Sequence, residues 1–96
     1  GTMIKVIAKC TFYEDKIEEA KNLYSKLVEE SRKEKGCIAY NLYQSNDNRL
    51  VLLMIEEWDS NESLEIHKQS KHFTELVPQI SKLRKFNELN TYELIY

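Results

Sequence analysis

The sequence predicts an α+β fold of the ferredoxin-like kind, with strands and helices in the order β-α-β-β-α-β. Three observations lead to this prediction. Near the N-terminus, apolar side chains alternate with the period of a strand. A stripe at helical spacing follows, and the middle of the chain holds two strand-like segments separated by a turn. The chain has 96 residues, which fits a single small domain over residues 1–96.

The first predicted strand is residues 4–12, in which Ile4 begins an alternation of period two. Asp15 stands three residues before Glu18, the spacing of a capping box, and this predicts the start of a helix. Gly36 is expected to end that helix by taking positive φ, so the helix would be about twenty residues long. One stripe of the helix comprises Ile17, Ala20, Leu23, Tyr24, Leu27, Val28 and Ser31.

Two strands are expected next, over residues 38–44 and 50–58, and the polar residues 45–48 form the turn between them. The second of these strands is apolar on both faces as far as Ile55, which is typical of a central strand. One of its faces carries Leu50, Leu52, Met54, Glu56 and Trp58, and the other carries Val51, Leu53, Ile55 and Glu57.

The remaining third of the chain predicts a helix followed by a strand. Ser60, or Asp59 in a capping box, is expected to cap the helix. Ser70 is a candidate start for a further helical piece. Pro78 is expected to kink or interrupt that piece, because proline lacks the backbone donor. Residues 86–96 are predicted to form the last strand.

The predicted sheet needs a cover on both faces. In this fold the helices cover only one face, and the strand over residues 50–58 would leave an apolar patch on the other. The chain has no residues to spare for extra loops. We therefore expect a homodimer in which two copies pack sheet to sheet around a two-fold axis.

Composition excludes several classes of function. The formal net charge is −2, and no Lys/Arg block suggests a nucleic-acid partner. No apolar run approaches the roughly 18 residues of a membrane span, and no signal peptide is visible, so a cytoplasmic protein is expected. Cys10 and Cys37 are expected to be buried reduced thiols, and no cysteine spacing predicts a metal site. Gly1 and Thr2, which precede Met3, are expected to be the remnant of an expression tag.

The best candidate for a small-molecule site lies where residues 52–60 (LLMIEEWDS) end and residues 67–73 (HKQSKHF) follow. A buried strand would end there beside a carboxylate and the one Trp of the chain. The next helix would bring an imidazole back to the same place. Groups that can move protons would therefore meet an apolar, aromatic wall.

Three segments, residues 34–40 (EKGCIAY), 56–60 (EEWDS) and 67–73, resemble the antibiotic biosynthesis monooxygenase family. The resemblance covers nearly the whole chain and implies a dimeric α+β barrel. Known activities in that family include cofactor-free oxidation of quinols and polycyclic phenols, haem degradation, and isomerisation of a phosphorylated signal sugar.

The resemblance also sorts these activities. Haem-degrading members have Asn, Trp and His at the positions that are Cys10, His67 and Val77 here, so haem degradation is disfavoured. The polyketide-oxidising member has an Asn where this chain has Met54. The run that ends in Trp58 and is followed by His67 is most similar to the quinol-oxidising bacterial branch.

A cofactor-free oxygenase of this kind needs a dry pocket, a base and donors to an oxyanion. His67 is the candidate base, because its ordinary pKa is near the working pH. Tyr40 is a candidate hydrogen-bond donor, and Glu56 is expected either to orient an imidazole or to accept from a buried donor. The residues expected to bind an aromatic substrate are Trp58, Phe73, His72 and Met54.

Each of these residues also has a purely structural interpretation. Trp58 is typical of a core anchor, His67 of the edge of an amphipathic helix, and His72 of a surface position.

From the resemblance and these candidate residues, the predicted function is a cofactor-independent monooxygenase acting on a quinol or phenol-like molecule, with two alternatives. One is a non-catalytic ligand-binding or stress-response dimer. The other is an isomerase of a phosphorylated sugar, although no glycine-rich phosphate loop is present.

Overall fold

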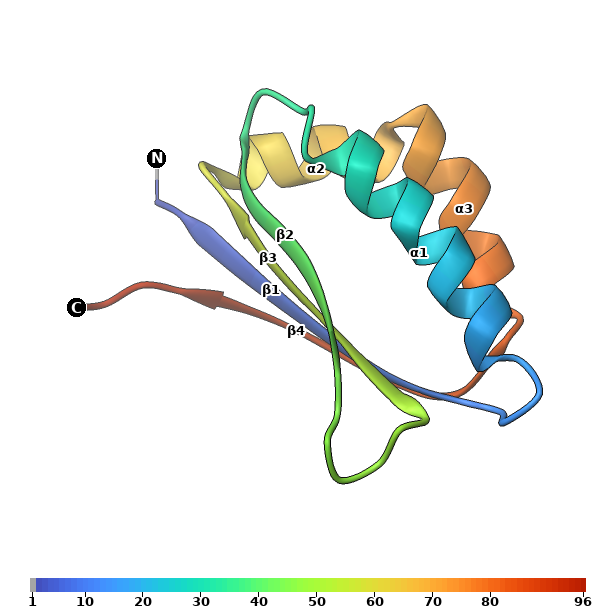
Figure 1. Cartoon of the computed structure of the whole chain (residues 1–96). Helices are drawn as coiled ribbons and strands as arrows, with labels where there is room; N and C mark the ends of the chain where they lie inside the picture. The colour runs from blue at the N-terminus through green and yellow to red at the C-terminus, as the bar shows by residue number, and fades with distance from the viewer. Residues whose placement is uncertain (1) are drawn as a thin grey trace.

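A four-stranded antiparallel sheet and a layer of three helices make up the computed structural model, which describes residues 2–96 (Figure 1). Gly1, one of the two residues expected to be a tag remnant, lies outside the described residues. The elements are β1 (Ile4–Phe12), α1 (Ile17–Ser31), β2 (Cys37–Gln44), β3 (Val51–Trp58), α2 (Asn61–Gln69), α3 (Lys71–Ser81) and β4 (Arg84–Glu93). The predicted α+β ferredoxin-like class is confirmed, with the second helical region divided into two helices.

The strands lie in the order β2-β3-β1-β4, so β1 and β3 are the central pair. β1 pairs antiparallel with both β3 and β4, and its Val6 is opposite Glu56 of β3. Tyr40 of β2 is opposite the same Glu56. Residues opposite each other share a face, so Tyr40, Glu56 and Val6 form one row across the sheet.

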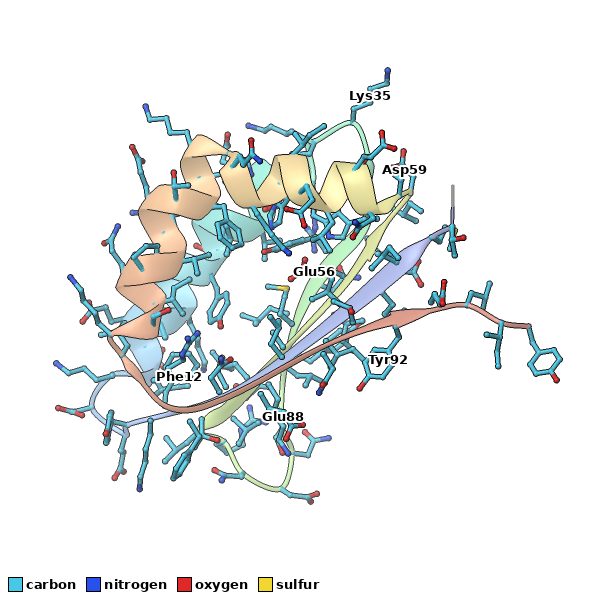
Figure 2. The ribbon with its side chains drawn as sticks, turned by 180° about the vertical axis from the view of Figure 1, so that it is seen from behind. Phe12, Lys35, Glu56, Asp59, Glu88 and Tyr92 are labelled. Carbon is cyan, nitrogen blue, oxygen red and sulfur yellow. The ribbon has the colours of Figure 1, made fainter. Side chains whose placement is uncertain are left out.

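The helices cover one face of this sheet only (Figure 1). On the covered face most residues of the central strands are buried, and the exposed fraction is 0 % for Trp58 and 1 % for Phe12. Figure 2 shows Phe12 and Glu56 between the sheet and the helices, and Glu88 and Tyr92 on the other side. Large side chains remain exposed on that other side, namely Tyr43, Phe86 and Tyr92.

The structure corrects both predicted ends of α1. The helix begins at Ile17 after Lys16, and no side chain caps it, so the Asp15 capping box is not formed. It ends at Ser31 rather than at Gly36, and it has 15 residues. Gly36 does not take positive φ. A Cβ at Gly36 would lie 2.0 Å from Ser63 Oγ, so this glycine allows the chain to pass close to α2.

The second helical region is divided at Ser70, whose ψ of 155° is extended. The Ser70 hydroxyl donates to the His67 carbonyl at 2.7 Å and accepts from the Phe73 backbone N–H at 3.2 Å. One serine therefore ends α2 and caps α3. Ser60 caps α2 in the same way, as predicted, by accepting from the Ser63 N–H. The division at Ser70 places His67 and Phe73 on different helices.

The C-terminal part differs from two of the expectations. α3 includes Pro78 and continues to Ser81, so of the two effects expected of the proline, an interruption of the helix is excluded. The last strand is Arg84–Glu93 rather than residues 86–96. It ends at Glu93, which lies opposite Ile4, the first residue of the partner strand β1. Among the described residues, no helix combines the length and the apolar character that a membrane crossing requires.

Candidate functional site

A cavity of about 220 Å³ lies between the sheet and the helices. A cavity of about 150 Å³ can already hold benzene, so this one has room for a larger aromatic molecule. Five of the residues predicted for the site line it, namely Tyr40, Met54, Glu56, His67 and Phe73. Leu89 of β4 also lines it and is 58 % exposed, which shows that the cavity opens on the β4 side.

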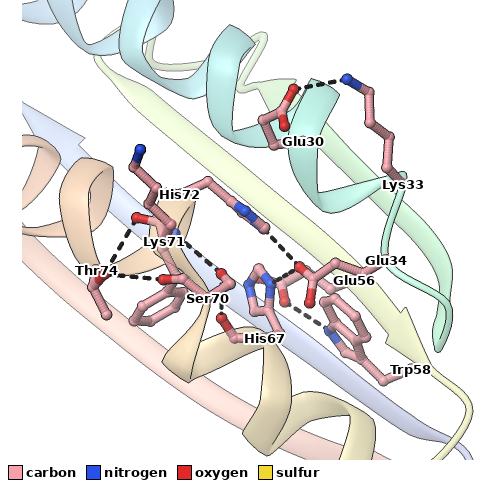
Figure 3. A network of polar contacts seen from close by, with 11 residues as sticks. Glu30, Lys33, Glu34, Glu56, Trp58, His67, Ser70, Lys71, His72 and Thr74 are labelled. Atoms are coloured by element: carbon pink, nitrogen blue, oxygen red, sulfur yellow. Dashed lines mark hydrogen bonds and ion pairs between the residues drawn. The ribbon is translucent and has the colours of Figure 1, made fainter.

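His67 is the most constrained polar side chain of the cavity. It is 1 % exposed, and its Nδ1 lies 2.5 Å from Glu34 Oε2 (Figure 3). A carboxylate oxygen only accepts hydrogen bonds, so the proton of the neutral imidazole belongs on Nδ1. His67 Nε2 then carries a lone pair, and it is buried without a hydrogen-bond partner among the described residues. This is the arrangement of a general base held by a carboxylate.

Burial keeps this imidazole neutral. It lowers the pKa of His67 below its ordinary value, and this effect exceeds the opposing effect of the Glu34 carboxylate. A neutral imidazole is the form that accepts a proton. A neutral His67 thus meets one chemical requirement of a general base at neutral pH.

Glu34, which was not among the predicted site residues, organises this part of the site. It lies in the turn between α1 and β2, and the same Oε2 also accepts from His72 Nε2 at 2.8 Å. His72 itself does not line the cavity. The signal in the sequence was weak, because Glu34 is 33 residues from His67 and only the fold brings them together.

Of the two roles expected for Glu56, the structure shows the acceptor role and not the orientation of an imidazole. Its Oε1 accepts from Trp58 Nε1 at 3.0 Å, so it satisfies a buried donor. Burial raises the pKa of the Glu56 carboxyl to about 7, although the hydrogen bond from Trp58 opposes that rise. Near neutral pH the cavity therefore holds a carboxyl group that is partly protonated and able to donate.

Aromatic rings surround the imidazole of His67. The centroid of Trp58 lies 4.4 Å away, that of Phe73 5.1 Å and that of Tyr40 5.3 Å. Trp58 is fully buried and does not line the cavity, whereas Phe73 and Tyr40 do. Burial, followed by the nearby Glu56, raises the pKa of the Tyr40 hydroxyl, so Tyr40 is a neutral donor.

The opposite end of the cavity is also polar. Tyr24 donates its hydroxyl to Cys10 Sγ at 3.7 Å, and Cys10 Sγ donates to Asn87 Oδ1 at 3.6 Å. Both cysteines are free, as predicted, and Cys10 is buried whereas Cys37 is only partly so. Arg84 lines this end as well. None of these residues was predicted for the site. They come together because β4 pairs with β1, and the sequence pattern did not specify that pairing.

Glu34, His67 and His72 also offer the donor set of a metal centre. One ligand atom from each lies within 4.8 Å of the other two, and two imidazoles with one carboxylate can hold a divalent transition metal. In a tetrahedral site such atoms lie about 3.3 Å apart. Here the two nitrogen–oxygen distances are 2.5 Å and 2.8 Å, shorter than that spacing and typical of hydrogen bonds. The three side chains are therefore arranged as a hydrogen-bonded cluster rather than as a set of metal ligands.

The Glu56 carboxyl predicts a specific pH dependence of stability. Its pKa is raised from 4.5 to about 7 on folding, so the folded chain binds the proton more tightly than the unfolded chain does. The free energy of unfolding of the wild type should fall as the pH rises through this window, by roughly 3 kcal/mol at most. Glu56→Gln should lack this decline, which urea unfolding at a series of pH values would measure.

The difference between the two unfolding curves isolates Glu56. The lowered pKa of His67 acts with the opposite sign, but it is common to both proteins and cancels. Curves that stay parallel from pH 4.5 to 8 would show that the Glu56 carboxyl is not desolvated.

Known proteins resemble this chain in both sequence and fold. The family model for antibiotic biosynthesis monooxygenase matches residues 3–79. A conserved protein from Methanosarcina mazei is 41 % identical, with a TM-score of 0.91 over 95 % of this chain and 91 % of that one. A Bacteroides thetaiotaomicron protein described as a possible oxidoreductase is 31 % identical, with a TM-score of 0.93 over 97 % and 98 %.

A structure named antibiotic biosynthesis monooxygenase is 32 % identical, with a TM-score of 0.91 over 97 % of this chain and 99 % of that one. Two curated relatives, uncharacterized proteins of Synechocystis and Bacillus subtilis, are longer, and the matches cover 55 % and 60 % of them. The family model, in contrast, matches most of the present chain. The chain belongs to the antibiotic biosynthesis monooxygenase family.

Proposed function

We propose that the protein is a cofactor-independent monooxygenase that oxidises a quinol or phenol-like molecule, with His67 as the general base. Family membership supports a monooxygenase-like function in general. The observation that carries the more specific proposal is the geometry of His67. Its Nδ1 is bonded to Glu34, and its buried Nε2 has no partner among residues 2–96.

The first step removes a proton from the substrate. His67 Nε2 accepts the hydroxyl proton of a quinol or phenol bound in the cavity, and Glu34 stabilises the imidazolium that forms. The aromatic anion is a much better electron donor than the neutral molecule, and it passes an electron to O₂. This step requires an electron-rich substrate and a dry cavity.

The complete reaction balances with O₂ as the oxidant. For a hydroquinone, one oxygen atom enters a ring C–H bond and gives a hydroxyquinone. The other oxygen atom leaves as water, with the two hydrogens that the hydroquinone loses on becoming a quinone. The proton held by His67 returns in the formation of that water.

Two further groups would stabilise negative charge on the substrate. Tyr40 and Glu56 line the same cavity. Both have raised pKa values, so Tyr40 is protonated and Glu56 is partly protonated near pH 7. Each can then donate a hydrogen bond to an anionic oxygen. Phe73 and Met54 supply apolar walls for the ring.

His67→Ala should lower the rate of quinol-dependent O₂ consumption by about 10²–10⁴, the usual contribution of a general base. Added imidazole should restore part of the rate, because the truncated side chain leaves space for it. An oxygen electrode and a panel of benzo- and naphthohydroquinones would measure both effects. Glu34→Gln should cause a smaller loss, since its amide oxygen can still accept from Nδ1.

Glu30→Gln is the matched control for Glu34→Gln. Glu30 precedes Glu34 by four residues and pairs with Lys33 on the surface, so its removal should leave the rate unchanged. Equal rates for wild type and His67→Ala would remove His67 from the mechanism. Ligand binding without any O₂ consumption would favour the alternative of a non-catalytic ligand-binding protein.

We also propose that two copies associate through the uncovered face of the sheet. Leu53 and Ile55 lie on that face in the central strand β3, and Tyr43, Phe86 and Tyr92 flank them. Charged side chains such as Lys5, Lys9 and Glu88 lie on the same face, but exposed aromatic and aliphatic side chains gathered in this way mark an association surface. A second copy would bury it with the same residues on both sides.

Light scattering during gel filtration should therefore give about twice the chain mass of 11.4 kDa. Leu53→Lys should shift the mass to that of one chain, because it removes an apolar side chain from the middle of the interface and adds a second positive charge beside Lys9. Thr91→Lys, on the opposite face of β4, is the control and should leave the mass unchanged. A wild type that elutes as a single chain at micromolar concentration would contradict this proposal.

A further inference from the structure

The second polar end of the cavity contains a cation without an obvious structural role. Arg84 is the first residue of β4 and lines the cavity. In the part of the chain that the structure describes, its guanidinium takes part in no ion pair. Arg84 is only partly exposed. An arginine held against an apolar cavity without a carboxylate partner is available to a ligand.

The position of Arg84 along the sheet separates it from His67. Glu56, near the His67 end, is opposite Val6 of β1, whereas Asn87 is opposite Cys10 and Arg84 is opposite Phe12. Val6 and Cys10 are four residues apart on the same strand, which corresponds to about 13 Å. The cavity therefore has a proton-accepting end and a cationic end, with apolar side chains such as Ala8 and Met54 between them.

The other charged residues of the cavity do not duplicate Arg84. Lys68 lines the cavity, but its ammonium pairs with Glu65 at 3.3 Å and its side chain is about half exposed (46 %). Glu56 is the one carboxyl group among the lining residues, and it lies at the far end beside Trp58. At the Arg84 end, Asn87 adds a side-chain amide. Planar guanidinium with an amide donor beside it matches the geometry of a carboxylate.

We propose that Arg84 forms an anion subsite, and that the substrate is an aromatic acid with its carboxylate at Arg84 and its acidic hydroxyl at His67. The placement of the substrate hydroxyl at His67 rests on the proposed function. The placement of the carboxylate rests on Arg84 alone. The substrate class is thus narrowed from phenols in general to hydroxylated aromatic carboxylates whose two polar groups lie at opposite ends.

Two commercial probes test this directly, because they differ only in the carboxylate. They are 2-naphthol and 6-hydroxy-2-naphthoic acid, and calorimetric titration at pH 7 under nitrogen gives their dissociation constants without turnover. The wild type should bind the acid at least tenfold more tightly than the naphthol. Arg84→Gln should abolish this preference and leave the affinity for the naphthol unchanged.

Lys68→Gln is the matched control, since it removes the other cation that lines the cavity and should keep the preference. The preference should also weaken when NaCl is raised from about 0.02 M to 0.5 M. Equal affinity of the wild type for both probes, or a preference that persists in Arg84→Gln, would overturn the proposal. A thermal melt confirms that each variant is folded.

This experiment separates the subsite from the proposed reaction. If the acid binds preferentially through Arg84 but no hydroxylated aromatic acid supports O₂ consumption, the subsite stands and the proposed oxidation fails. If both probes bind equally and both are oxidised, the reaction stands and the subsite fails.

Discussion

The site depends on the hydrogen bond between Glu34 Oε2 and His67 Nδ1. Without it the imidazole could rotate or carry its proton on the other nitrogen, and Nε2 could no longer serve as the base that we propose. The bond requires that the turn after α1 lies directly on α2. Gly36 makes this possible, because any larger residue would collide with Ser63 at the start of that helix. A tight backbone contact thus positions the carboxylate that orients the imidazole.

Burial then gives the cavity its chemical character. The same desolvation lowers the pKa of His67 and raises that of Glu56 to about 7, so near neutral pH the imidazole is neutral and the carboxyl is partly protonated. A neutral base and a partly protonated acid can lie in one apolar cavity without the cost of two buried charges. In the fraction of molecules in which Glu56 is protonated, the charge that develops on a substrate would meet a donor rather than an opposing carboxylate.

The sequence predicted the fold well where one pattern decides the structure. Alternation along residues 4–12 and the apolar run that ends at Trp58 each specify a strand, and their pairing follows from the order of elements. It predicted less well where two local signals compete. Gly36 was interpreted as a helix end, although its role is to allow close packing. Ser70, in contrast, starts a further helix as predicted, because its hydroxyl accepts from the Phe73 N–H while also donating to the His67 carbonyl.

The candidate site was predicted in part for the same reason. His67, Glu56 and Tyr40 follow from residue types and strand register, and the structure places them on one cavity. Glu34 and Arg84 were missed, since their roles depend on contacts between segments far apart in the sequence. The tautomer of His67 is the central claim, and long-range ¹H–¹⁵N correlation spectroscopy at pH 7 tests it most directly. We expect a neutral ring with the proton on Nδ1; a proton on Nε2, or on both nitrogens, would contradict the account.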